Sequence, residues 1–233
     1  MIEVKDLVKK YGSNIAVNHA NFTINDGEII GFLGPNGAGK STTMNIITGF
    51  LSATSGTVSI DGYDILNDPI KAKSRIGFLP EIPPLYVDMT VREYLDFVYD
   101  LKKTTLPRKP HLDEIVKLVK IDAVQNRLIR NLSKGYRQRV GIAQALIGNP
   151  DVLILDEPTV GLDPQQIIEI RTLISKLGKN HTVILSSHIL SEIQAVCERI
   201  IIINQGYIIA DGSTEELSKS ISSDNSLIAS IVG

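Results

Sequence analysis

The chain has 233 residues, enough for one large domain or two small ones with a sizeable buried core. Lys and Arg number 24 against 26 Asp and Glu, so the formal net charge of −2 offers no basic excess that would favour a nucleic-acid partner. One cysteine, Cys197, excludes an internal disulfide and fits a cytosolic protein; its place in the helix-like stretch 192–199 predicts a packed, inert thiol.

The start of the chain does not resemble a secretion signal, because residues 1–10 mix apolar side chains with Glu3, Lys5 and Asp6. No apolar run approaches the roughly 18 residues that a membrane-spanning helix needs. The purest runs, 152–155 and 200–203, have the length of a strand. We therefore expect any role at a membrane to depend on a partner.

Two kinds of strand are predicted. Apolar residues in 2–7 indicate a first strand, and residues 58–60 followed by Asp61-Gly62 form a hairpin pattern, because Gly accepts the positive φ of a tight turn. We expect an antiparallel sheet there. Other segments are apolar on both faces, as strands of a parallel sheet covered by helices must be. These segments are 29–33, 152–155 and 183–185.

The apolar period becomes helical between Thr90 and Pro150. Thr90 with Glu93 forms a capping-box pattern that would begin the first helix. The proline-containing stretches 80–84 and 107–110 predict loops around and within this part. We therefore expect a compact helical subdomain inserted into an α/β core. Two apolar faces carry the pattern: Val91, Tyr94, Leu95 and Val98, and then Leu112, Ile115, Val116 and Val119.

The end of the chain has a different character. A polar run, 222–226, leads into the apolar segment 227–232, and the sequence stops one residue later. This pattern indicates the opening of a strand without a partner. We interpret the tail 216–233 as the start of a further domain, truncated or lost.

A phosphate-binding motif follows the strand 29–33 and precedes the helical stretch 42–47. Residues 34–41, Gly-Pro-Asn-Gly-Ala-Gly-Lys-Ser, match G-x-x-x-x-G-K-[ST]. The glycines let backbone N–H groups surround phosphate, Lys40 reaches the terminal phosphates, and Ser41 ligates Mg²⁺. A Gly-rich turn that carries Lys-Ser by chance is the alternative. The predicted nucleotide contacts are Asn36, Gly37, Ala38, Gly39, Lys40, Ser41 and Thr42.

A pair of acids ends the buried strand 152–155. Asp156 and Glu157 stand at its carboxyl end, where open α/β sheets place their ligands. We expect Asp156 to hold Mg²⁺ and Glu157 to orient or deprotonate the water that attacks the γ-phosphate. The alternative, that Asp-Glu-Pro merely ends the strand in a turn, loses weight beside the phosphate loop.

With these motifs, the chain resembles an ATP-binding-cassette (ABC) ATPase from Tyr11 to about Gly212. The segment 132–139, Leu-Ser-Lys-Gly-Tyr-Arg-Gln-Arg, is similar to the family's LSGGQ signature. In the family this segment grips the γ-phosphate of ATP bound to the opposite subunit, so the resemblance assigns Ser133, Lys134 and Gly135 to ATP. Ser133 also looks like an N-cap whose helix offers N–H groups to an anion. A merely capped helix is the alternative, and the segment departs from the family pattern at Lys134 and Tyr136.

The resemblance implies roles for five more residues. Asp163, in Gly-Leu-Asp, belongs to the loop that connects the two active sites, and His188, in Ser-His, is the switch histidine that contacts the γ-phosphate. Tyr11 stacks on adenine with Val17 as its apolar neighbour. Glu81, in Leu-Pro-Glu, replaces the glutamine that links Mg²⁺ and the attacking water to the helical subdomain. A carboxylate can still ligate Mg²⁺ or its water, although it adds negative charge beside the phosphates.

The implied fold is α/β: a P-loop NTPase (RecA-like) core with an N-terminal antiparallel β subdomain and an inserted α-helical subdomain. The resemblance implies one ATPase domain over residues 1–215. Its core and antiparallel β subdomain would comprise 1–84 and 151–215, and its helical signature subdomain would comprise 85–150. The implied activity is hydrolysis of ATP with Mg²⁺, with Lys40, Glu157 and His188 as catalytic residues, in a head-to-tail homodimer or with a homologous cassette.

The resemblance also implies a transmembrane permease as partner, with this chain in the cytoplasm at the inner face of the membrane and no nucleic acid bound. Residues 81–94 would receive a helix of that permease, and Pro83, Leu85, Tyr86 and Val87 supply apolar side chains for it. Ordinary packing between subdomains is the alternative for these four. The combination of Glu81 with a Lys-Gly-Tyr signature looks most like bacterial exporters of a drug, antibiotic, lipid or polysaccharide, whose membrane protein is a separate chain.

Two other functions are weighed against this one. An ABC-type ATPase acting on ribosomes or DNA typically carries two cassettes or a long coiled-coil arm, and this chain shows one cassette and no run of heptads. A kinase or GTPase would leave the segment 132–139 unexplained, and the Asn-Lys-x-Asp segment that reads guanine does not occur.

Overall fold

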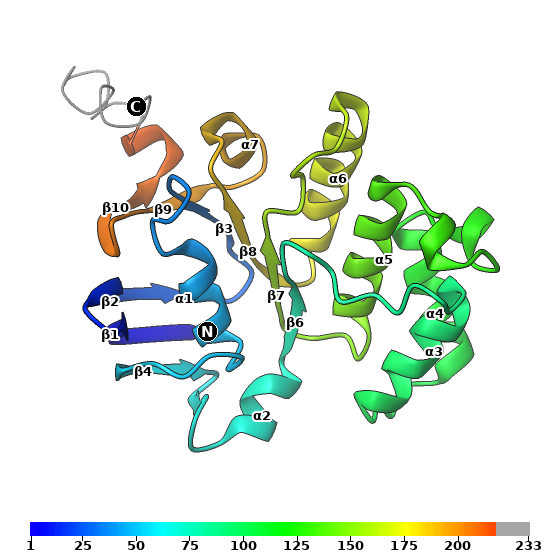
Figure 1. Cartoon of the computed structure of the whole chain (residues 1–233), viewed down its shortest axis with the longest axis horizontal. Helices are drawn as coiled ribbons and strands as arrows, with labels where there is room; N and C mark the ends of the chain where they lie inside the picture. The colour runs from blue at the N-terminus through cyan, green and yellow to red at the C-terminus, as the bar shows by residue number, and fades with distance from the viewer. Residues whose placement is uncertain (218–233) are drawn as a thin grey trace.

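The computed structural model describes residues 1–217 of the chain. Two β-sheets stand beside each other, helices cover them, and a group of helices lies at one end of the molecule (Figure 1). No helix within 1–217 is long and apolar enough to cross a membrane. The strand predicted at 227–232 lies outside the described residues.

The first sheet is antiparallel, as predicted, with the strand order β2-β1-β4-β5. The hairpin prediction is confirmed: Asp61 and Gly62 take φ values of 50° and 79° between β4 and β5, and Ile60 pairs with Tyr63. This sheet has one face buried, because its apolar residues alternate with polar ones. Its strands are β1 Ile2–Tyr11, β2 Asn14–Ile24, β4 Ser55–Ile60 and β5 Tyr63–Asp64.

The second sheet has six strands in the order β10-β9-β3-β8-β7-β6, and all but the edge strand β10 pair in parallel. Every residue of β7 and β8 is buried, so the prediction of strands covered on both faces is confirmed. The strands are β3 Ile29–Leu33, β6 Ile76–Leu79, β7 Val152–Asp156, β8 Thr182–Ser187, β9 Arg199–Asn204 and β10 Tyr207–Ser213.

Helices occupy both faces of the second sheet and the end of the molecule beyond β6. The capping box is present as predicted: the Thr90 hydroxyl accepts from the Glu93 N–H, and the Glu93 carboxylate accepts from the Thr90 N–H. The helices are α1 Lys40–Ile47, α2 Pro69–Ser74, α3 Val91–Leu101, α4 Arg108–Leu118, α5 Lys134–Leu146, α6 Pro164–Leu177 and α7 Leu190–Gln194, with 3₁₀ turns at Asp122–Val124 and Ile129–Asn131.

Two predictions about local structure were wrong. The loop expected at 107–110 ends at Pro107, and Pro110 lies in the first turn of α4, where a missing N–H leaves no helical hydrogen bond unmade. The helix expected at 192–199 ends at Gln194, so Cys197 lies in the connection to β9. Its thiol is packed all the same, with 4% of the residue exposed, and burial raises the pKa of Cys197 to about 12.

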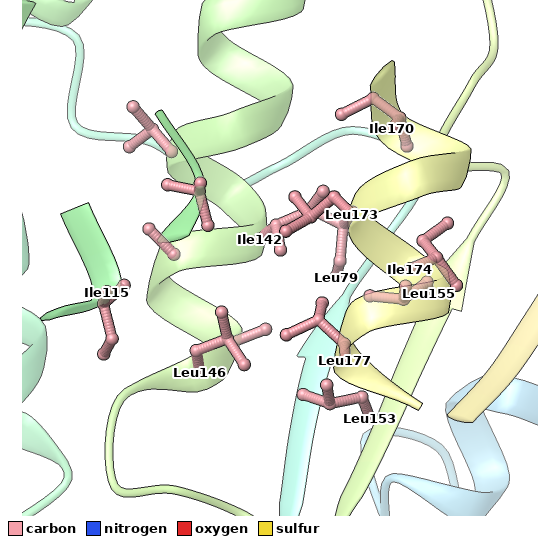
Figure 2. Packing of buried hydrophobic residues seen from close by; sticks show 14 of the residues in the cluster. Leu79, Ile115, Ile142, Leu146, Leu153, Leu155, Ile170, Leu173, Ile174 and Leu177 are labelled. Atoms are coloured by element: carbon pink, nitrogen blue, oxygen red, sulfur yellow. The ribbon is translucent and has the colours of Figure 1, made fainter. Parts of the chain in front are cut away.

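The core lies on both faces of the six-stranded sheet. One cluster joins α1, the antiparallel sheet and the near face of the second sheet. The other joins the opposite face to the helices, and Figure 2 shows Ile142 of α5 and Leu173 of α6 beside Leu79 of β6, with Leu146 of α5 and Leu177 of α6 near Leu153 of β7. The six-stranded sheet is therefore packed on both faces, and its face toward the helices shares one core with the helical part.

Candidate nucleotide site

The predicted phosphate loop, the two acids and the histidine meet at one edge of the six-stranded sheet. Strands β3, β8, β7 and β6 are neighbours in that order, and the segments that follow their carboxyl ends carry these residues. They surround a cavity of about 320 Å³. It is lined by Ala16, Asn36, Gly37, Gly39, Lys40, Ser41, Thr42, Glu81, Glu157, Val160 and His188.

The phosphate loop depends on glycine at two positions. Gly37 and Gly39 have φ values of 80° and 112°, a region that residues with a Cβ rarely adopt. A Cβ on Gly39 would lie 2.5 Å from the Ala16 carbonyl oxygen, whereas one on Gly37 would meet no atom within 4 Å. The loop thus presents bare backbone at the N-terminus of α1, which is where an anion binds best.

Lys40 is held at the mouth of this loop. Its ammonium donates to the Gly34 carbonyl at 2.7 Å and to the Pro35 carbonyl at 3.3 Å, although only 5% of the residue is exposed. The same nitrogen lies 3.4 Å from a carboxylate oxygen of Glu157. A buried cation anchored to a Gly-rich loop suits the terminal phosphates of a nucleotide.

Glu157 joins this cation to the histidine. Its two carboxylate oxygens lie 3.2 and 3.0 Å from Nδ1 of His188, and 6% of Glu157 is exposed. The imidazole is more open, with 37% of its side chain exposed. A buried carboxylate between a cation and an imidazole can orient water and accept a proton beside a bound phosphate.

Asp156 and Glu157 are tied together by Ser186 of β8. The Ser186 hydroxyl donates to Oδ1 of Asp156 and accepts from the Glu157 N–H at 2.9 Å. Glu157 has a φ of 48°, which is unusual for a residue with a Cβ and occurs where surrounding contacts hold the backbone. The strand register pairs Asp156 with Ser186, so the sheet itself produces this contact.

The predicted Mg²⁺ ligands supply hard oxygen atoms of the kind that Mg²⁺ prefers. Ser41 and Glu81 line the cavity, whereas Asp156 is not part of the lining and only 3% of it is exposed. In the part of the chain that the structure describes, no three His, Cys, Asp or Glu side chains gather as a metal site.

The signature residues lie at a second cavity, of about 340 Å³, whose lining includes Ser133, Gly135 and Asp163. Ser133 caps α5 as predicted, accepting from the Tyr136 N–H at 3.4 Å, and Asp163 caps α6, accepting from the Gln166 N–H at 2.9 Å. Both helix N-termini thus open onto the same cavity. Lys134 is outside that lining, and its ammonium lies close to Gly161 in the loop after β7.

The role predicted for Val17 stays a prediction. Val17 is fully buried in β2 as part of the core, and its neighbour Ala16 lines the cavity. Tyr11 is the last residue of β1 instead of following it, and it is 49% exposed with the Lys9 ammonium 5.1 Å from its ring centre. Its contact with adenine stays a prediction.

The segment predicted to receive a permease helix divides into packed and exposed residues. Pro83 faces Gly141 of α5, and Leu85 packs against the core. In contrast, 54% of Tyr86 and 44% of Val87 are exposed. Sequence reasoning missed Ile82, which is 82% exposed; a lone isoleucine beside prolines carries no signal that separates an exposed position from a buried one.

Sequence reasoning also missed contacts that depend on the tertiary structure. Val160, three residues after Glu157, lines the cavity. Ser186 on the neighbouring strand bonds to both acids. The sequence shows Ser186 next to Ser187-His188. Only the pairing of β8 with β7 shows that the Ser186 hydroxyl lies beside Asp156. Glu192, a buried carboxylate near the histidine, had no signal of its own.

Comparisons with known proteins agree with this geometry. The family model described as ABC transporter matches residues 17–160. The chain is 40% identical over 221 residues to the bacitracin transport ATP-binding protein BcrA of Bacillus licheniformis, covering 94% of this chain and 72% of that protein. It is 36% identical over 222 residues to the lipopolysaccharide export system ATP-binding protein LptB of Haemophilus influenzae, covering 93% and 92%.

A solved structure gives the same result at the level of the fold. The chain superposes with a TM-score of 0.82 and 28% identity on an ATP-binding cassette determined as a dimer in a post-hydrolysis state with ADP and phosphate. The match covers 91% of this chain and 98% of that one.

Proposed function

This chain belongs to the ABC transporter family as an ATP-binding ATPase subunit that powers transport, and on that premise we propose that it drives export through a separate membrane subunit. The observation that carries the proposal is the single cavity shared by the phosphate loop, Glu157 and His188. These relatives are named as transport and export proteins. They give no support to an ATPase acting on ribosomes or nucleic acid, or to a kinase or GTPase.

The proposed site residues are those predicted from the sequence, Val17 included. The loop 34–41 holds the phosphates through its N–H groups and Lys40, and Glu157 accepts the proton of the attacking water. His188, in contact with Glu157, keeps that carboxylate and the γ-phosphate in register. Tyr11 stacks on the adenine.

Ser41 and Asp156, with Glu81 directly or through water, are the residues proposed to hold Mg²⁺. When bound, the ion neutralises charge that develops on the transferred phosphate. Ser41 and Glu81 lie on the cavity, so the replacement of glutamine by Glu81 keeps an oxygen ligand in place.

The second cavity supports a proposed head-to-tail dimer. Ser133, Gly135 and Asp163 present two helix N-termini to it, which suits the γ-phosphate of a nucleotide held by another chain. Since each chain carries Glu157 and His188, a homodimer would have two complete sites; a homologous cassette is the other arrangement that this geometry supports. A relative of this fold was determined as a dimer.

The proposed setting is the cytoplasmic face of the membrane, with a transmembrane permease as partner and no nucleic acid. Ile82, Tyr86 and Val87 form an exposed apolar segment after β6 that suits a short helix of that partner. The names of the relatives specify bacitracin transport and lipopolysaccharide export, and we propose an antibiotic or a lipid as the cargo.

A pull-down from native membranes tests the proposed setting. A tagged Glu157→Gln chain loaded with ATP is expected to pull down an integral membrane protein. The Ile82→Ser/Tyr86→Ser double variant is expected not to retain that protein. A Glu114→Gln variant, altered at an exposed acid on α4, serves as the matched control. Capture of ribosomal proteins or DNA in place of a membrane protein would overturn the proposal.

A further inference from the structure

Glu192 is a buried carboxylate that the proposed site does not use. It lies in α7, five residues after Ser187, and only 6% of it is exposed, whereas Glu198 in the connection to β9 is exposed. A carboxylate removed from water costs free energy unless hydrogen bonds or charges compensate it. Its partners therefore indicate what it does.

These partners come from three other elements. Oε2 of Glu192 accepts from the Thr159 hydroxyl at 2.6 Å and from the Ser187 hydroxyl at 3.1 Å. Its Oε1 lies 3.7 Å from the Arg171 guanidinium of α6. One carboxylate thus connects α7 with the loop after β7, the end of β8, and α6, and β7 and β8 are neighbours in the sheet (Figure 1).

Two of these partners flank the residues proposed to hydrolyse ATP. Thr159 stands two residues after Glu157, and Ser187 immediately precedes His188. Glu157 and His188 touch at 3.0 Å, and the left-handed backbone of Glu157 must be held by its surroundings. Ser187 is constrained further, because its hydroxyl also accepts from the Ile189 N–H at 3.1 Å.

We infer that Glu192 is a positioning residue for ATP hydrolysis: through Thr159 and Ser187 it fixes the distance between Glu157 and His188. The inference rests on the roles proposed above for those two residues. Glu192 is absent from the cavity lining and makes none of the contacts of the loop 34–41. Its removal therefore affects turnover and leaves nucleotide binding unchanged.

The test compares kcat with the affinity for ATP in three variants. Glu192→Leu and Thr159→Val, which remove the acceptor and one donor, are expected to lower kcat between about 10- and 100-fold, since displacement of a reacting group by about 1 Å has that effect. The Kd of ATP, measured by titration, stays at the parental value. Glu192→Gln keeps an oxygen that accepts from both hydroxyls, so it restores most of kcat.

A double variant separates positioning from general loss of stability. If Glu192 and Thr159 act through one contact, kcat falls no further in the double variant Glu192→Leu/Thr159→Val than in the more impaired of the two single variants. Effects that pass through a shared contact are not additive. Thermal unfolding confirms that each variant is folded, and Glu198→Gln is the matched control with parental kcat. Should Glu192→Leu not fold, Thr159→Val decides the question.

Three outcomes overturn the inference: parental kcat in folded Thr159→Val or Glu192→Leu, weakened ATP binding with kcat unchanged, or additive losses in the double variant. Glu157→Gln measured beside them separates the two claims. Parental turnover in Glu157→Gln would overturn the proposed chemistry itself, whereas an inactive Glu157→Gln with a fully active Thr159→Val would overturn only the role of Glu192.

Discussion

Replacement of Glu157 by glutamine tests the proposed chemistry most directly. The amide has nearly the volume of the carboxylate and keeps an oxygen facing His188, so the cavity and its backbone are preserved. What the variant loses is the ability to accept a proton and the charge 3.4 Å from the Lys40 ammonium. Removing that charge also frees Lys40 for phosphate, so ATP binding is retained or strengthened.

The expected loss follows from the contribution of a general base. Such a group typically accelerates proton transfer by about 10²- to 10⁴-fold. At 1.36 kcal/mol for each factor of ten, the barrier rises by about 3–5 kcal/mol. The assay is phosphate release at saturating ATP and Mg²⁺, with binding measured by titration and the nucleotide-bridged dimer by size-exclusion chromatography.

The control for this prediction is Glu114→Gln, which changes an exposed acid on α4 and is expected to hydrolyse ATP at the parental rate. Glu157→Gln should bind ATP, accumulate as a dimer and nearly stop turnover. A Glu157→Gln chain that releases phosphate as fast as the parent would show that another group activates the water, and the assignment of the base would fail.

Three further outcomes are expected. Lys40→Ala weakens ATP binding by at least about tenfold, because a charge-assisted contact to phosphate contributes about 1.5–3 kcal/mol; unchanged affinity in a titration would contradict the phosphate cradle. Glu81→Gln leaves phosphate release largely intact, since both side chains offer an oxygen to the cavity, and lost activity would reveal a distinct duty for the carboxylate. Cys197 resists iodoacetamide at pH 8 in the native state and reacts once denaturant unfolds the chain, because burial holds its pKa at about 12 and the thiolate is the reactive form; rapid native labelling would refute that burial.

Much of the fold could be predicted because local pattern and tertiary environment agree. The apolar run 29–33 became β3 with unchanged bounds, and the capping box at Thr90 begins α3. The predictions of a loop at 107–110 and of a helix at 192–199 were wrong because each rested on local composition alone. Proline suits a first helical turn as well as a loop, and an apolar stretch with acids fits either a helix or a turn into a strand.

The division of the chain at residues 85 and 150 stays a prediction. So do the individual roles of the site residues, although the structure places Lys40, Glu157, His188 and Glu81 around one cavity. Val17 is among these residues: the resemblance suggests a place beside the adenine, and the structure shows that the inward face of β2 buries its side chain.

The phosphate loop, the acids after a buried strand and the family can be read from the sequence, because those features are contiguous and spacing along the chain sets their chemistry. Which distant groups meet depends on the tertiary structure. Ser186 reaches Asp156 and Glu157 through the register of β7 and β8, and Glu192 reaches Thr159 and Ser187 because α7 packs beside β8. Hydrogen bonds act over about 3 Å, and no pattern in one chain specifies which side chains separated by 30 residues come that close.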